Sequence, residues 1–98
     1  MTQDARPPVP ASVLATAPPP VLVVEPALQL QALCRSVLAA AGHTVATAAD
    51  AAEGIAAFRR HKPGIVLLDL ALPDRDGTIL AGQILAEAPE TVILAMTS

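Results

Sequence analysis

The sequence has 98 residues, of which 53% are hydrophobic and only Phe58 is aromatic. This length allows one domain, with a core built mainly from small aliphatic side chains. A formal net charge of −3 at pH 7 argues against direct binding to nucleic acid. No apolar run approaches the ~20 residues of a membrane-spanning helix, and the single cysteine, Cys34, excludes an internal disulfide. We therefore expect a cytoplasmic protein with no direct contact to nucleic acid or membrane.

The first segment differs in composition from the rest of the chain. Residues 1–20 contain six of the ten prolines, interleaved with Ala, Ser and Thr. Proline lacks a backbone N–H and has a fixed φ, so this segment cannot form a regular helix or a central strand. We expect residues 1–20 to be a disordered leader and residues 21–98 to form the folded domain.

From residue 21 onward, the pattern predicts alternating strands and helices. Four short apolar segments predict strands: residues 21–24, 43–48, 65–69 and 91–98. Three segments between them predict helices: residues 27–41, 51–61 and 77–87. Strands and helices that alternate in units of this length are typical of an α/β fold with a parallel sheet and right-handed crossovers.

The predicted helices have apolar faces and recognisable ends. The apolar stripe of the first helix has helical spacing and consists of Leu30, Leu33, Cys34, Val37, Leu38 and Ala41. Cys34 is therefore predicted to be a core residue, and Gly42 to end the helix. Asp50 and Glu53 have the spacing of a capping box at the start of the second helix. The third helix is expected to contribute four core residues: Leu80, Ala81, Ile84 and Leu85.

Asp69 ends the third predicted strand. The uninterrupted apolar run before it, which starts at Ile65, predicts a strand buried on both faces. Ligands gather at the carboxyl ends of parallel strands, and an unpaired buried carboxylate is costly, so Asp69 is a candidate functional residue. Pro73 then directs the chain out of the strand, and we interpret Asp74 and Asp76 as turn-forming residues.

The segment from Asp69 through Leu72-Pro73 to Asp76-Gly77 resembles the phosphoacceptor segment of receiver domains, the modules of bacterial two-component response regulators. The resemblance extends over residues 21–98. It implies a flavodoxin-like parallel sheet with the strand order two-one-three-four. In that arrangement Glu25 and Asp69 lie side by side. The sequence stops after the fourth strand, so it lacks the fifth strand and the last helices of the family.

The resemblance also implies roles for individual residues. Asp69 would be the phosphoacceptor, and the hydroxyl of Thr97 would bind the phosphoryl group. Mg²⁺ would be held by Glu25, Asp69 and the backbone carbonyl of Ala71, which are the oxygen ligands that this ion prefers. Pro26 stands where the family has its second acidic residue, so the affinity for Mg²⁺ is expected to be weakened or lost.

The function implied by the resemblance is signalling by a phosphoacceptor receiver domain, not enzymatic catalysis. The domain would take a phosphoryl group from a sensor histidine kinase or a histidine phosphotransfer protein onto Asp69. The apolar edge of the fourth strand would also invite pairing with a second copy of the chain. The alternative is a degenerate pseudo-receiver, an interaction or dimerisation module independent of phosphorylation, which Pro26 and the missing fifth strand favour.

Residues 74–78 also resemble parts of two other motifs. Asp74-Arg75-Asp76-Gly77-Thr78 matches the nucleophile loop of haloacid-dehalogenase-like phosphatases. In that family the first Asp directly ends an apolar strand, whereas four residues separate Asp74 from Asp69 here. The same segment lacks the closing Glu of a calcium-binding loop. Neither motif therefore displaces the receiver-domain hypothesis.

Overall fold

The computed structural model describes residues 18–97, so residues 1–17 of the predicted leader and Ser98 lie outside the described residues. The strands are β1 (Val21–Val24), β2 (Val45–Ala48), β3 (Ile65–Asp69) and β4 (Val92–Met96). The helices are α2 (Leu28–Ala40), α3 (Ala51–His61) and α4 (Gly77–Glu87). All seven predicted elements are present, and their bounds differ from the predicted ones by at most two residues.

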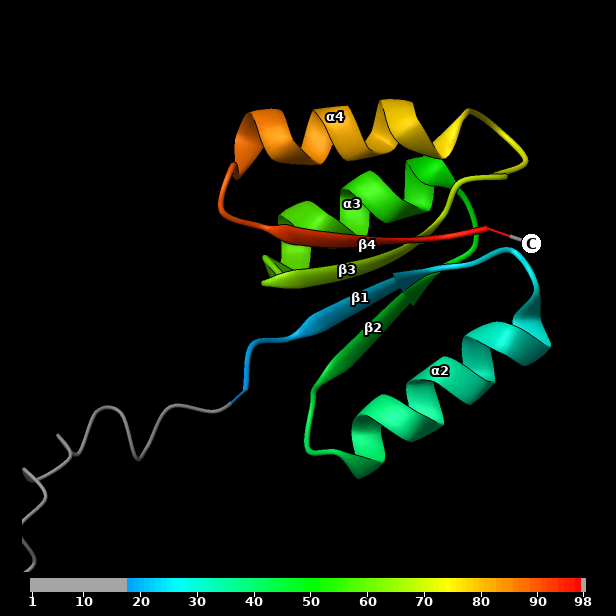
Figure 1. Ribbon diagram of the computed structural model, residues 1–98, viewed down its shortest axis with the longest axis vertical. Coiled ribbons are helices and arrows are strands. Elements are labelled where there is room, and N and C mark those ends of the chain that lie inside the picture. The colour runs from blue at the N-terminus through cyan, green and yellow to red at the C-terminus, as the bar shows by residue number, and fades with distance from the viewer. Residues whose placement is uncertain (1–17, 98) are drawn as a thin grey trace, which may run out of the picture.

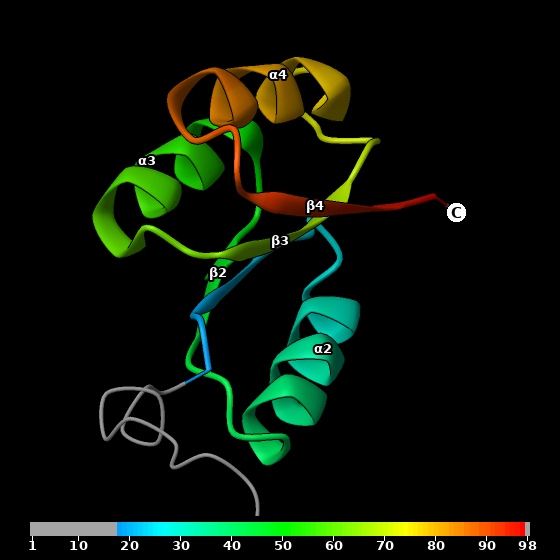
Figure 2. The same ribbon diagram turned by 60° about the vertical axis from the view of Figure 1, so that its left-hand side comes forward.

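The four strands form one parallel sheet in the order β2-β1-β3-β4. Helices α3 and α4 lie on one face of this sheet, and α2 lies on the other (Figures 1 and 2). The strand order is the flavodoxin-like order that the resemblance implied. Because every strand runs in the same direction, all four carboxyl ends meet at one edge of the sheet. None of the helices within residues 18–97 has the length and apolarity that crossing a membrane requires.

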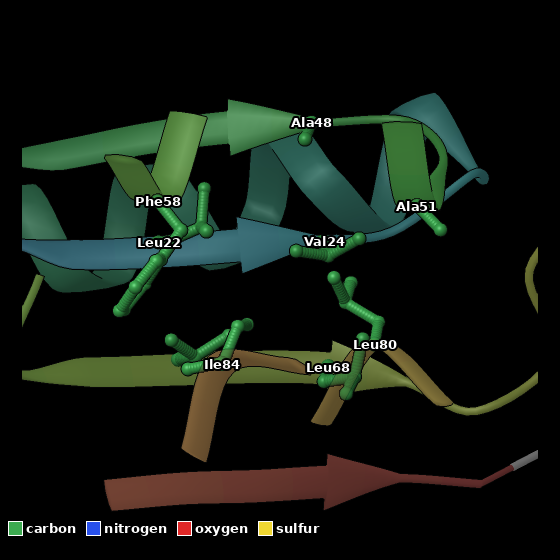
Figure 3. Packing of buried hydrophobic residues seen from close by; sticks show 9 residues of the cluster. Leu22, Val24, Ala48, Ala51, Phe58, Leu68, Leu80 and Ile84 are labelled. Atoms are coloured by element: carbon green, nitrogen blue, oxygen red, sulfur yellow. The ribbon is translucent and has the colours of Figure 1, made fainter. Parts of the chain in front are cut away.

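The core lies between the sheet and the helix pair α3–α4. Figure 3 shows side chains from β1, β3, α3 and α4 meeting in this layer. The buried members of this cluster are Leu22, Val24, Ala48, Ala51, Phe58, Val66, Leu68, Leu80 and Ile84. Gly54 lets α3 pack closely against α4 and β1, because a Cβ at this position would lie 3.0 Å from Leu80 Cδ2 and 3.3 Å from Val24 Cγ2. Small side chains thus allow tight packing with a single aromatic residue.

The opposite face of the sheet is much more open. None of the residues of α2 is buried, and Leu33 and Val37 are each 60% exposed. The helix contacts β1 and β2, and Val92 and Leu94 on β4 remain 52% and 51% exposed. Cys34 is only half-buried, so the prediction that it is a core residue is wrong. The apolar stripe of α2 has no partner on its far side among the described residues.

Two other burial predictions are also wrong, for related reasons. On β3, Val66 and Leu68 are buried, but Ile65 and Leu67 are only half-buried because they point to the open face. Leu85 is 41% exposed, whereas Gly77, Leu80 and Ile84 are the buried residues of the same helix. An apolar sequence pattern identifies which side chains can be buried, but burial also requires an element that covers them.

Leu80 is fully buried between α4 and the sheet, and it allows a test of this core. We expect Leu80→Ala to lower the free energy of unfolding by about 2–5 kcal/mol, because the truncation leaves a cavity. Urea unfolding followed by circular dichroism measures this loss. Leu85→Ala, on the same helix but exposed, should cost less than about 1 kcal/mol. Equal losses in the two variants would contradict the assignment of the core to this face.

Candidate functional site

Two acidic residues meet at the carboxyl edge of the sheet. In the pairing of β1 with β3, Val24 lies opposite Leu68, so the next residues, Glu25 and Asp69, come to lie beside one another. Glu25 continues the ladder, because its N–H donates to the Ala48 carbonyl at 2.9 Å. The register of the parallel strands therefore places both carboxylates together, as the resemblance implied.

The environment of Glu25 is unusual for a carboxylate. Its side chain is only 2% exposed, and this burial is the main cause that raises its pKa above the ordinary value of 4.5. A hydrogen bond with the Asp69 carboxyl group raises the pKa further, and so does the negative charge of Asp69, while the Ala27 N–H lowers it. Two neighbouring carboxylates at a buried position favour a proton or a bound cation between them.

The backbone around Asp69 orients its carboxyl group. Asp69 Oδ1 accepts a hydrogen bond of 2.8 Å from the Ala71 N–H. Gly77, at the start of α4, donates its N–H to the Leu70 carbonyl at 2.9 Å. A Cβ at Gly77 would lie 2.7 Å from Leu70 Cα and 2.8 Å from the Asp69 carbonyl oxygen. Only glycine allows α4 to begin so close to the strand that carries Asp69.

Asp74 connects the loop after β3 to helix α3. Its Oδ1 and Oδ2 accept hydrogen bonds from the Ala51 and Ala52 N–H groups at 2.8 and 2.9 Å. Asp50, the N-cap residue of α3, accepts a bond of 2.8 Å from the Glu53 N–H. Two carboxylates therefore cap this helix, one from its own sequence and one from a distant loop. The interpretation of Asp74 as a turn former misses this role.

Asp76 is the N-cap residue of α4. Its Oδ1 accepts bonds from both the backbone N–H and the hydroxyl of Thr78, each at 2.8 Å. These bonds lower the pKa of Asp76 below its ordinary value of 3.8. The motif that resembles a phosphatase nucleophile loop is thus a pair of helix caps.

The three helices begin at the same edge of the sheet as the strands end (Figure 1). Each helix carries partial positive charge at its N-terminus. Backbone N–H groups at such termini bind anionic groups, phosphate among them. On α3 and α4 such N–H groups already donate to Asp74, Asp50 and Asp76, so these termini would favour an added negative charge through their partial positive charge.

This edge offers few side-chain oxygen atoms to a metal ion. Within residues 18–97, no three His, Cys, Asp or Glu side chains lie close enough together to hold one. Glu25 and Asp69 supply two carboxylates, and Ala71 lies in the loop that follows Asp69. Pro26 has no side-chain oxygen to add. This donor set fits Mg²⁺, which binds through a few oxygen ligands and keeps several waters.

Thr97 also lies at this edge. It follows Met96, which pairs with Asp69 in the register of β3 and β4. Its side chain is exposed to solvent. The structure thus brings Glu25, Asp69 and the Ala71 loop together and places Thr97 one residue beyond the partner of Asp69.

Two residues of this edge were not identified from the sequence. The hydrogen bonds of Asp74 join residues 22 and 23 positions apart, so no local sequence pattern predicts them. Gln31 lies off the apolar stripe of its helix, yet its amide donates to the Glu25 and Ala48 carbonyls. A glutamine on the polar side of a helix gives no sequence signal for such a contact.

Comparison with known proteins agrees with the resemblance to receiver domains. The family model of the response regulator receiver domain matches residues 21–98. The probable transcriptional regulatory protein TcrX of Mycobacterium tuberculosis is 35% identical over 81 residues, covering 83% of this chain and 35% of that protein. A protein-glutamate methylesterase/protein-glutamine glutaminase of Natronomonas pharaonis is 35% identical over 74 residues, covering 74% of this chain and 21% of that protein. The chain thus spans about a third or less of these relatives.

Solved structures share the same fold. A CheY-like response regulator receiver domain protein from Methanospirillum hungatei has a TM-score of 0.80 at 26% identity, covering 83% of this chain and 65% of that chain. The receiver domain of NtrX from Brucella abortus has a TM-score of 0.73 at 31% identity, covering 76% of this chain and 64% of that chain.

The double cap on α3 predicts a pH-dependent contribution of Asp74 to stability. The Ala51 N–H is the main cause that lowers the pKa of Asp74 below 3.8, and the Ala52 N–H adds to it. Because the folded-state pKa is the lower one, this stabilisation is present above pH 3.8 and is lost as the pH falls through the folded-state value. Asp74→Asn should therefore unfold at a lower urea concentration than the parent at pH 7.

The difference between Asp74→Asn and the parent should narrow as the pH is lowered below 3.8. Glu90→Gln, which removes an exposed carboxylate outside the helices, serves as the control and should shift the midpoint little. A difference that stays constant across this pH range would contradict a charged cap.

Proposed function

The chain belongs to the response regulator receiver domain family of two-component signalling, and from this premise we propose that it is a phosphoacceptor. Asp69 takes the phosphoryl group from a sensor histidine kinase or a histidine phosphotransfer protein. The observation that carries this proposal is the position of Asp69 at the carboxyl edge of the sheet, beside the buried Glu25. The domain acts as a signalling switch in the cytoplasm, not as a metabolic enzyme.

The proposed transfer is a substitution at phosphorus. A carboxylate oxygen of Asp69 attacks the phosphorus of the donor phosphohistidine, in line with the P–N bond. The new P–O bond forms as the P–N bond breaks, and the leaving imidazole nitrogen takes the electron pair and then a proton from solvent. The hydrogen bond from the Ala71 N–H to Asp69 Oδ1 holds the attacking carboxylate in one orientation, which reduces the entropic cost of the transfer.

The product places more negative charge beside Glu25. The N-termini of the helices at this edge offset part of that charge, and the hydroxyl of Thr97 would donate to a phosphoryl oxygen. Receiver domains typically bind Mg²⁺ in their acidic pocket, and Glu25, Asp69 and the Ala71 carbonyl are the groups that would hold it here. When bound, this ion neutralises charge on the phosphoryl group. Because Pro26 supplies no ligand, we propose a weaker affinity than two acids at this edge would give.

We also propose that a second copy of the chain is a partner, through the edge of β4. Val92 and Leu94 are about half exposed on this strand, and Val92–Met96 carries no charge that would oppose association. An exposed apolar edge strand is a template for pairing with another chain. No direct role for nucleic acid or membrane is proposed.

Intact-mass spectrometry after incubation with acetyl phosphate and Mg²⁺ tests the phosphoacceptor role. We expect the mass of one phosphoryl group to be added to the parent, none to Asp69→Asn, and one to Glu90→Gln. Chelation of the metal should suppress the gain. Pro26→Asp should lower the Mg²⁺ concentration needed by about tenfold, because it adds an oxygen ligand.

A folded protein that gains no phosphoryl group at any Mg²⁺ concentration would overturn the proposal. That outcome would leave the pseudo-receiver, an interaction module that works without phosphorylation. A gain that persists in Asp69→Asn would place the acceptor elsewhere.

Sedimentation velocity over a range of protein concentrations tests the homodimer. We expect the parent to associate as its concentration rises and Leu94→Lys to remain monomeric, since the lysine places a charge on the exposed face of β4. Leu85→Lys, on α4, serves as the matched control and should behave as the parent does. A parent that stays monomeric throughout would contradict pairing through β4.

A further inference from the structure

Gln31 links helix α2 to the ends of two strands. Its Nε2 donates hydrogen bonds to the Glu25 carbonyl at 3.0 Å and to the Ala48 carbonyl at 3.2 Å. Both residues that accept these bonds are buried, at 2% exposure each. The side chain of Gln31 is itself half-buried, so these bonds form where water has limited access.

These bonds satisfy backbone groups at the point where the ladder between β1 and β2 ends. The last rung is the bond from the Glu25 N–H to the Ala48 carbonyl. Because β2 ends at Ala48, the Glu25 carbonyl is beyond the regular pairing of the two strands. A primary amide carries two N–H donors, which suits two carbonyls side by side. The Ala48 carbonyl already accepts from the Glu25 N–H, so the amide matters most for the Glu25 carbonyl, because a buried carbonyl without a donor is costly.

The loop between β1 and α2 has few other bonds that fix Glu25. Pro26 has no backbone N–H, and Ala27, the N-cap residue of α2, has no side-chain oxygen to cap the helix. The contact from the Ala27 N–H to Glu25 Oε2 is long, at 3.4 Å. The amide of Gln31 therefore contributes two of the shorter bonds that hold this turn against the sheet.

We propose that Gln31 is a positioning residue for the acidic centre: by holding the Glu25 backbone, it keeps the Glu25 carboxylate beside Asp69 in the arrangement that binds a divalent cation. This inference rests on the proposed function for its link to phosphorylation. Gln31 does not touch the reacting atoms, so it acts on the affinity for the cation and not on the transfer of the phosphoryl group. Residues that orient metal ligands typically change metal affinity by about 10–100-fold when they are replaced.

Gln31→Met tests the proposal, because methionine has a similar length but no N–H donor. Gln29→Met is the matched control: the same substitution on the same helix at an exposed position. The first readout is the affinity for Mn²⁺, measured from paramagnetic broadening of the Ala71 amide signal in NMR spectra. We expect Gln31→Met to bind about 10–100-fold more weakly than the parent and Gln29→Met to match the parent.

The second readout is the Mg²⁺ dependence of phosphorylation by acetyl phosphate. In Gln31→Met the half-saturating Mg²⁺ concentration should rise by the same factor as the Mn²⁺ dissociation constant. The rate at saturating Mg²⁺ should stay within about threefold of the parent rate. A merely structural role would lower the saturating rate and leave the half-saturating concentration unchanged, and this result would overturn the proposal.

The two readouts separate the failure of this proposal from that of the proposed function. A parent that binds Mn²⁺ but gains no phosphoryl group would overturn the phosphoacceptor role, while the Mn²⁺ comparison would still decide the role of Gln31. Equal Mn²⁺ affinities in the parent and in folded Gln31→Met would overturn the positioning role of Gln31. A parent that binds no Mn²⁺ would overturn this role as well. Should Gln31→Met not fold, Gln31→Asn, whose amide is shorter by one methylene, takes its place with the same expectations.

Discussion

The arrangement at the carboxyl edge of the sheet depends on a buried Glu25 beside a second carboxylate, Asp69. Burial and the neighbouring charge both raise the pKa of Glu25, so the pair is unfavourable when both groups are ionised. Groups nearby act against that cost: the Ala27 N–H lowers the pKa of Glu25, the Ala71 N–H bonds to Asp69, and helices begin at the same edge. This electrostatic cost favours a proton or a cation beside the two carboxylates.

The rest of the fold holds this pair in place. Parallel pairing of β1 with β3 sets the register, and the core beneath α3 and α4 fixes the strands. Gly77 lets α4 begin against the backbone of Asp69, and Asp74 ties the loop after β3 to the start of α3. On the other face of the sheet, no residue of α2 is fully buried. The two hydrogen bonds of the Gln31 amide therefore contribute much of what holds the turn between β1 and α2 against the sheet.

The order of the elements along the chain was predictable, because hydrophobic periodicity determines it. The strand order, and with it the meeting of Glu25 with Asp69 at the carboxyl edge, was predicted from the resemblance to receiver domains. The exposure of Leu33 and the incomplete burial of Cys34 were not predictable, since an apolar stripe is buried only if another element covers it. The contacts of Asp74 and Gln31 join residues distant in the sequence or on the polar side of a helix, and such contacts follow from packing alone. The roles of Asp69, Thr97 and the Mg²⁺ ligands rest on resemblance, and they remain proposals.

The most direct test of this account is a pH titration of the metal-free protein, followed by the carbon-13 signals of the side-chain carboxyl groups. The account predicts that Glu25 titrates above its ordinary value of 4.5. In Asp69→Asn the midpoint of Glu25 should fall toward that value but remain above it, because burial persists. The contrary result is a Glu25 midpoint at or below 4.5 that does not change in Asp69→Asn. It would contradict the claim that the two carboxylates form one acidic centre.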